Sequence, residues 1–225
     1  MVPQFTRANP DRANPLSTTI LIDEFTVAST ESGETGELGW GFTNGSFGIV
    51  NPEASHPGIC RRTSTAVATT VASTFTGGGG TAAAIRMDQF DEMTWIIKPT
   101  TADADFDLRF GLASDLTSAT PTNGAYFEKL AADTNWFGVG RVSGVQTRAD
   151  TGTAFAAGWF KLKVRRLSAS SVGFSVNGGA EVTVTGDVPI GTNILAFGFH
   201  VVPQSANARS VDVDFFSMKL TAQAR

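Results

Sequence analysis

The chain has 225 residues, 41% of them hydrophobic and 17 of them Phe, which suits one all-β domain with a sizeable core. Only 17% of residues are charged and the formal net charge is −4, which argues against nucleic acid as a partner. The single cysteine, Cys60, excludes an intrachain disulfide, and no run approaches the roughly 20 apolar residues of a membrane span.

Residues 1–18 differ in composition from the rest of the chain. They hold three of the nine prolines and a short tandem, RANPD followed by RANPL, so they suit neither a helix nor a central strand. They contain no apolar run of signal-peptide length, which argues against secretion by the general pathway, and the single cysteine fits a protein that matures in a reducing cytoplasm. One interpretation is a disordered tail or a cloning remnant. The other is an extended arm that orders against a partner, with Phe5 and Leu16 as anchors and Arg7 and Arg12 as charge contacts.

From residue 19 onward, short segments with period-two alternation predict β-strands. The clearest is 158–167, where apolar and basic residues alternate: Phe160, Lys161, Leu162, Lys163, Val164 and Arg165. Residues 171–184 predict a hairpin, because Asn177 and Gly178 form the strongest short hairpin signal. The other expected strands cover 19–27, 93–99, 105–113, 193–202 and 209–220.

The regular spacing of these segments, with turn residues between them, predicts about ten to thirteen strands in a sandwich or barrel. The best helix candidate, residues 124–133, is too short to form a helical layer. The glycine run at 76–81 is expected to be a loop tip and not a phosphate-binding loop. We therefore predict an arm over 1–18 and one antiparallel two-sheet sandwich over 19–225.

Catalytic patterns are weak in this sequence. Glycoside hydrolysis needs two carboxylates at a defined separation, but the acids of residues 88–93 would point to opposite faces of a strand. A catalytic triad needs a histidine base, and His56 lies in a turn while His200 ends a predicted strand. We interpret both histidines as structural and predict a protein that is not an enzyme. A hydrolase or lyase with an unrecognised site is the remaining alternative.

Calcium is a candidate ligand because three acids alternate at the start of a predicted strand: Asp103, Asp105 and Asp107. An EF-hand loop would need glycine at Leu108 and glutamate at Ser114, so the match fails. The simpler interpretation places these carboxylates on the solvent face of the strand together with Arg109, opposite its apolar residues Phe106, Leu108 and Phe110. No cofactor is predicted, although a calcium ion between loops would leave no motif.

Residues 123–152 gather aromatic side chains among glycines and small polar residues. They could line a sugar-binding groove or fill the core of the sandwich. Alternation predicts that Trp136 and its neighbour Phe137 lie on opposite faces, one in the core and one outside. If a glycan binds here, Tyr126, Trp136 and Arg141 are the expected contacts.

Taken as a whole, the sequence resembles the concanavalin A-like jelly-roll domains of bacteriophage structural proteins. The resemblance covers most of residues 20–220, and it rests on HPGI at 56–59, on GAYFEK followed by NW, and on the strand opening GWFKL. It implies an all-β, antiparallel two-sheet jelly roll that associates with a virion. The calcium and sugar ligands of legume lectins have no recognisable counterpart in this chain.

The leading hypothesis is therefore a non-enzymatic virion protein, such as a capsid decoration, head fibre, spike or tail component. Residues 1–18 would attach it to phage capsid or tail proteins, and we expect a homo-oligomer, with a trimer favoured by analogy. We expect it to be made in the host cytoplasm and located in the virion. The alternative is a glycan-binding, lectin-like module used in adhesion to the host surface.

Overall fold

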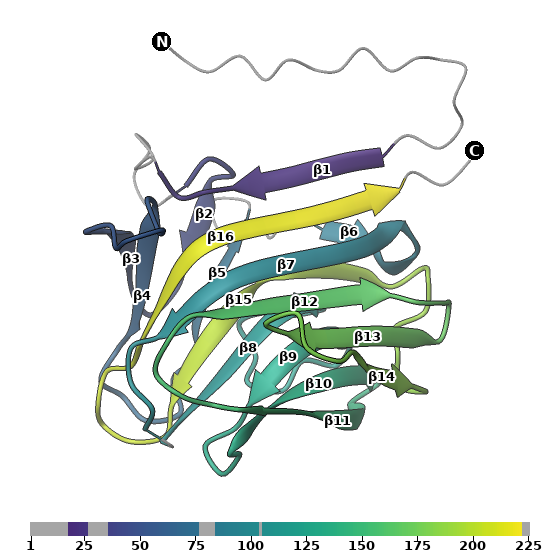
Figure 1. Ribbon diagram of the computed structural model, residues 1–225. Helices are drawn as coiled ribbons and strands as arrows, with labels where there is room; N and C mark the ends of the chain where they lie inside the picture. Colours follow the sequence, from purple (N-terminus) through teal and green to yellow (C-terminus); the bar gives the residue numbers. More distant parts are fainter. Residues whose placement is uncertain (1–17, 27–35, 77–83, 104, 222–225) are drawn as a thin grey trace.

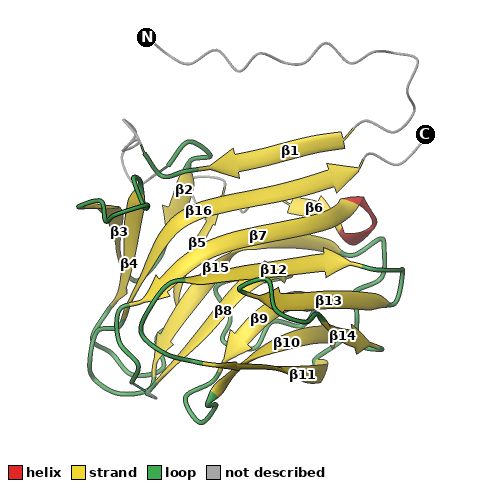
Figure 2. Ribbon diagram, viewed as in Figure 1, coloured by secondary structure: helices red, strands yellow, loops and turns green. Residues whose placement is uncertain are grey.

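The computed structural model describes residues 18–26, 36–76, 84–103 and 105–221. Sixteen strands form two antiparallel sheets of eight strands each, packed face to face (Figure 1). The one helical element of the described residues is a short 3₁₀ turn, η2 (Met87–Gln89), at the start of a long strand (Figure 2). The predicted antiparallel β-sandwich is confirmed.

Sheet A has the strand order β14-β13-β12-β7-β16-β4-β3, and β1 pairs with the second half of β16. Its strands are β1 (Thr18–Asp23), β3 (Gly45–Val50), β4 (Ile59–Ser64), β7 (Phe90–Pro99), β12 (Phe160–Arg166), β13 (Ser171–Val176), β14 (Val182–Thr185) and β16 (Ser210–Thr221). In Figure 1, β1 lies at one edge of this sheet, beside β16.

Sheet B has the strand order β11-β10-β9-β8-β15-β5-β2, and β6 also pairs with β15. Its strands are β2 (Trp40–Phe42), β5 (Ala72–Thr76), β6 (Ala84–Arg86), β8 (Phe106–Ala113), β9 (Gly124–Lys129), β10 (Asn135–Val142), β11 (Val145–Ala154) and β15 (Ile194–Pro203). Each sheet buries one face against the other, and we call the opposite face the outer face.

The alternation in the sequence correctly predicts which side chains of β12 face the core. On β12, Phe160, Leu162 and Val164 are buried, while Lys161 and Arg165 are exposed. Strand β12 pairs with β7 on one side and β13 on the other, so its apolar face lies over the middle of the core.

The predicted hairpin is also confirmed. Asn177 and Gly178 have φ values of 54° and 72°, the left-handed pair that a tight hairpin turn requires. Phe174 then pairs with Val182 across the hairpin.

The core between the sheets is dominated by aromatic rings. The ring centroids of Trp95 and Phe216, both from sheet A, lie 4.5 Å apart, and the ring centroid of Trp40 from sheet B lies 5.1 Å from that of Phe216. Phe110 and Phe199 stack at 4.9 Å on neighbouring strands of sheet B. Burial of each ring stabilises the fold by about 2–3 kcal/mol. Packing of these rings therefore stabilises a fold that has no intrachain disulfide.

The structure differs from the sequence predictions in two places. There are more strands than expected, because three-residue strands such as β2 and β6 are too short to show alternation. The helix candidate 124–133 is wrong: its first six residues form β9, in which Tyr126 and Phe127 point to opposite faces between β8 and β10. Most of the predicted arm, including Phe5, Arg7, Arg12 and Leu16, lies outside the described residues, as does most of the 76–81 loop.

Candidate functional site

The outer face of sheet B carries a row of buried polar side chains. Strand pairing places His200 opposite Arg109 and Arg109 opposite Glu128, so β15, β8 and β9 each give one residue to the row. The alternate residues of these strands, including Phe110, Phe127 and Phe199, point into the core. All three polar residues are buried even though they lie on the side away from the core.

Glu128 is held between two arginines. Arg109 Nε donates to Glu128 Oε1 at 2.7 Å, and Arg148 Nε lies 2.8 Å from Glu128 Oε2 in an ion pair. The second contact is close but poorly aligned for a hydrogen bond, so Oε2 keeps acceptor capacity. Arg148 also forms an ion pair with Asp133. The carboxylate of Glu128 is therefore neutralised by two fixed cations.

His200 is a neutral hydrogen-bonding element of this row. Burial, reinforced by the Arg109 cation, lowers the pKa of His200 to about 3. Because the Arg109 guanidinium can only donate, its contact of 2.9 Å with His200 Nε2 makes Nε2 the acceptor. We therefore assign the ring proton to Nδ1, which donates to the carbonyl of Leu116 at 3.3 Å.

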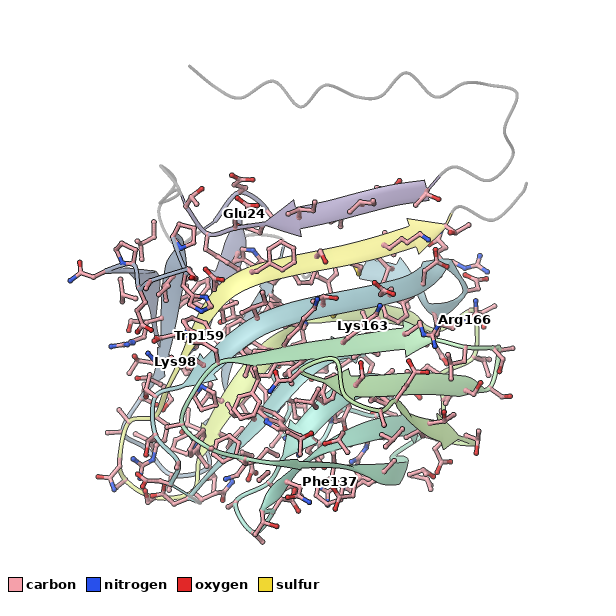
Figure 3. The ribbon with its side chains drawn as sticks, viewed as in Figure 1. Glu24, Lys98, Phe137, Trp159, Lys163 and Arg166 are labelled. Carbon is pink, nitrogen blue, oxygen red and sulfur yellow. The ribbon has the colours of Figure 1, made fainter. Side chains whose placement is uncertain are left out.

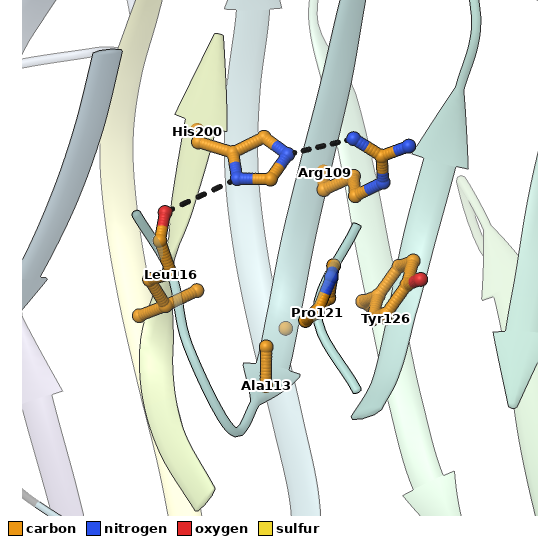
Figure 4. A pocket seen from close by; sticks show the side chains of 7 residues that line it. Arg109, Ala113, Leu116, Pro121, Tyr126 and His200 are labelled. Atoms are coloured by element: carbon orange, nitrogen blue, oxygen red, sulfur yellow. Dashed lines mark hydrogen bonds between the residues drawn. The ribbon is translucent and has the colours of Figure 1, made fainter. Parts of the chain in front are cut away.

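A loop that we call the strap, residues 114–123, connects β8 to β9 and folds over this end of the row. Its ends are joined by a hydrogen bond of 2.9 Å from the Ser114 amide to the Asn123 carbonyl. Leu116 and Pro121 of the strap are buried, and with Arg109, Tyr126 and His200 they line a small cavity (Figure 4). The strap explains why the polar row is shielded from solvent.

The structure corrects the aromatic platform expected from the sequence. Trp136 is 0% exposed and packs in the core against Phe155 at 5.5 Å and Phe160 at 5.6 Å. Tyr126 is on the outer face but only 1% exposed. Neither ring is therefore available to a ligand in this conformation.

The division between Trp136 and its neighbour is confirmed, because Phe137 lies on the outer face and is partly exposed (Figure 3). The Arg148 guanidinium carbon lies 4.0 Å from the Phe137 ring centroid. Arg141, the third predicted glycan contact, is partly exposed and donates to Gln146 Oε1 at 2.6 Å. The accessible aromatic residue of this face is thus Phe137, not Trp136.

Several polar atoms on this face lack a well-aligned hydrogen-bond partner. They are the Tyr126 hydroxyl, Glu128 Oε2 and the Nε atoms of Arg141 and Arg148. All four lie on the adjacent strands β9, β10 and β11. Burial, with a smaller effect of the Glu128 charge, raises the pKa of Tyr126, so its hydroxyl stays protonated and can donate.

A second polar cluster lies on the outer side of sheet A. The rings of His56 and Trp159 stack at 3.7 Å, and His56 Nδ1 lies 2.8 Å from Asp214 Oδ2. Glu53 forms an ion pair with Lys98 and accepts from Trp159 Nε1 at 3.2 Å. Each polar group has a partner within the cluster, as expected for a histidine with a structural role.

The acids proposed as calcium ligands are committed to other partners. Asp103 and Asp105 form ion pairs with Arg209. Asp107 accepts from the Ala131 amide at 2.6 Å and from Gln204 Nε2 at 2.8 Å. Within the described ranges, no group of three or more His, Cys, Asp or Glu side chains could hold a metal ion. No helix in this part of the chain is long and apolar enough to cross a membrane.

Several solved structures have a fold similar to that of this chain. The β-glucanase of Bacillus licheniformis is 13% identical, with a TM-score of 0.57, covering 88% of this chain and 97% of that one. The carbohydrate esterase vb_24B_21 of the Shiga toxin-encoding bacteriophage phi24B is 17% identical, with a TM-score of 0.55, covering 92% and 100%. These likenesses support the concanavalin A-like sandwich; the phage origin stays a prediction.

Residues 55–214 match the family described as SO2946-like, C-terminal domain, and the chain belongs to this family. The crystal structure of SO2946, a protein of unknown function from Shewanella oneidensis MR-1, has a TM-score of 0.63 at 18% identity. It covers 93% of this chain and 89% of that one. No curated protein sequence matches the chain.

The sequence missed the polar row as a unit. Arg109 was assigned to the polar face of its strand, but its partners lie 19 and 91 residues away. The signal was present in β8 and β9, where Arg109 and Glu128 alternate with core residues. What no local pattern shows is that these strands are neighbours and that the strap covers them.

Proposed function

We propose that the chain is a non-enzymatic structural module of a bacteriophage particle, attached through its N-terminal arm and assembled as a homo-oligomer. Support comes from the resemblance to phage jelly-roll domains and from the likeness in fold to a carbohydrate esterase of phage phi24B. The proline-rich composition of residues 1–18 supports a segment that binds in an extended form.

The surroundings of Glu128 support the proposal that the protein is not an enzyme. A glycosidase needs one carboxyl group that gives up a proton and a second that attacks or activates water. Glu128 is buried between Arg109 and Arg148 and forms an ion pair with each of them. Its neighbour on the outer face of β9 is Tyr126, so this strand presents one neutralised carboxylate and no partner acid.

A truncation tests the attachment. Strand β1 begins at Thr18, so removal of residues 1–17 leaves the β1–β16 ladder intact. We expect the truncated protein to keep the circular dichroism and unfolding midpoint of the full chain and to lose co-sedimentation with phage particles. A matched variant, F5A/L16A in the full-length chain, should weaken co-sedimentation as well. Co-sedimentation of the truncated protein at the full-length level would contradict the anchoring role.

Glycan binding is the second candidate function, and a specific arrangement favours it. Phe137 presents a partly exposed ring on the outer face of sheet B, and two partly exposed arginines, Arg141 and Arg148, share that face. A ring face for the C–H groups of a sugar, with several hydrogen-bonding groups nearby, is the chemistry that carbohydrate recognition requires.

A pair of phenylalanine variants tests this candidate. F137A should lose binding to any glycan that the wild-type protein captures on a glycan array. F215A is the matched control, because Phe215 is a partly buried phenylalanine of sheet A that, unlike its neighbour Phe216, is not part of the core. Equal binding by wild type, F137A and F215A would move the site away from Phe137. A wild-type protein that captures no glycan would contradict the candidate.

A further inference from the structure

We infer that the strap closes a pyranose-binding subsite on the outer face of sheet B, and that Leu116 occupies the position of the sugar ring. This inference rests on the glycan-binding candidate and adds to it the place, the ligand class and the element that must move. The subsite includes Arg109 and His200 of the polar row and is separate from the ring of Phe137.

The floor of the subsite is a pair of glycines between two aromatic residues. Strand pairing gives a continuous cross-strand row of Phe75, Gly198, Gly111 and Tyr126 over β5, β15, β8 and β9. Because the two glycines have no side chains, the outer face has a depression between Phe75 and Tyr126. A Cβ atom at Gly198 would lie 2.9 Å from Leu116 Cδ1 and 2.2 Å from a carbonyl of β5, so both the sheet and the strap require glycine here.

Leu116 fills this depression. Its side chain packs with Phe75, Ala113 and Ala196 in an apolar cluster that is separate from the main core. Its carbonyl accepts the hydrogen bond from His200 Nδ1. One strap residue thus supplies both an apolar surface and a hydrogen-bond acceptor. A pyranose offers the same pair of features, an apolar C–H face and hydroxyl groups, so it could replace Leu116 without leaving His200 unpaired.

The hydrogen bonding of the strap suits it to move as a unit. Its base is held by the Ser114–Asn123 bond and by contacts of Thr122 and Asn123 with the β10–β11 turn. Inside the loop, the Asp115 carboxylate accepts from Thr117, which also belongs to the strap. The described hydrogen bond between this part of the strap and the sheet is the one from His200 Nδ1 to the Leu116 carbonyl. Lifting the strap would therefore break one described hydrogen bond to the sheet, separate Leu116 from its apolar cluster and expose Pro121.

The space beside Leu116 is incompletely filled. The cavity in Figure 4 lies among Leu116, Pro121, Tyr126, Arg109 and His200. This cavity has room for no more than about one water molecule, so a sugar ring needs the space that Leu116 leaves when the strap lifts. The lifted strap would also free His200 Nδ1 to donate to a sugar hydroxyl group.

The first experiment removes the side chain that fills the subsite. We would titrate wild type and L116A by calorimetry with laminarihexaose, cellohexaose, chitohexaose and maltohexaose up to about 1 mM. If Leu116 competes with the sugar, L116A should bind at least one hexasaccharide about tenfold more tightly than wild type, because a larger fraction of molecules is open. L167A is the matched control, since Leu167 is an exposed leucine after β12, and it should bind as wild type does.

The second measurement uses the wild-type chain and covers the case in which L116A does not fold. Hydrogen exchange of the strap amides should rise on binding of the hexasaccharide, because the sugar displaces Leu116. Equal affinity of wild type and L116A, with unchanged strap exchange, would overturn the subsite while leaving glycan binding at Phe137 intact. Failure of all four sugars to bind either protein would overturn the subsite, and the glycan array then decides the glycan-binding candidate separately. Neither result touches the particle-attachment proposal.

Discussion

Acid should destabilise the fold through His200. The folded pKa of this imidazole is about 3, because burial and the Arg109 cation disfavour its charged form. In the unfolded chain the pKa returns to its ordinary value of about 6.5. Between these two values the unfolded state binds one more proton than the folded state, so stability increases with pH. The contribution is complete above pH 6.5 and is lost as the pH falls toward 3.

The expected size follows from the same two pKa values. At pH 4.5, two units below the unfolded pKa, protonation of the unfolded chain costs the fold about 2 to 3 kcal/mol. His200 is fully buried, so solvent screening does not reduce this effect. Carboxylates also titrate in this range, and a variant is needed to separate them.

The assay is urea unfolding of wild type and H200Q at pH 6.5 and pH 4.5. Glutamine does not titrate, and its amide can accept from Arg109 and donate to the Leu116 carbonyl, as the imidazole does. We expect wild type to lose about 2 to 3 kcal/mol more than H200Q between the two pH values. Equal losses, or an NMR titration that gives His200 a pKa above 6, would refute the reasoning.

Three further predictions concern buried groups. E128A should destabilise the fold by about 3–5 kcal/mol in urea, because the buried Arg109 loses its counterion and the partly exposed Arg148 loses one of two. An unchanged midpoint would contradict the role of this buried ion pair. D23A should cost about 2–3 kcal/mol, since the Asp23 carboxylate accepts from two amides and from Trp40 Nε1 at 2.8 Å; a loss below about 0.5 kcal/mol would show that these bonds contribute little. Burial raises the pKa of Cys60 to about 12, so a disulfide reagent should modify it only in denaturant; rapid labelling of the native protein would contradict its burial.

Local pattern was enough to predict the sandwich. The alternation of β12 and the Asn177–Gly178 turn are properties of neighbouring residues, and the structure has both as expected. The alternation of β8 also placed Phe106, Leu108 and Phe110 in the core. Strand number was underestimated because three-residue strands are held by pairing with distant partners and have no periodicity of their own.

The candidate site was much less visible in the sequence. Periodicity assigns a residue to one face of a strand, but it does not show whether another segment covers that face. Arg109 was therefore expected in solvent, and Tyr126 was expected to be available to a ligand. Both are buried by the strap and by cross-strand neighbours that lie far away in the sequence. The prediction for Trp136 was wrong because alternation puts Trp136 and Phe137 on opposite faces but does not show which of the two rings faces the core.

The central claim is that this chain is part of a phage particle, and particle fractionation tests it most directly. A lysate of the producing culture would be separated on a density gradient, and the fractions searched by mass spectrometry for the 23.6 kDa chain. The account predicts that the chain travels with the particles in stoichiometric amounts. A chain that stays at the top of the gradient, with the particles free of it, would contradict the account.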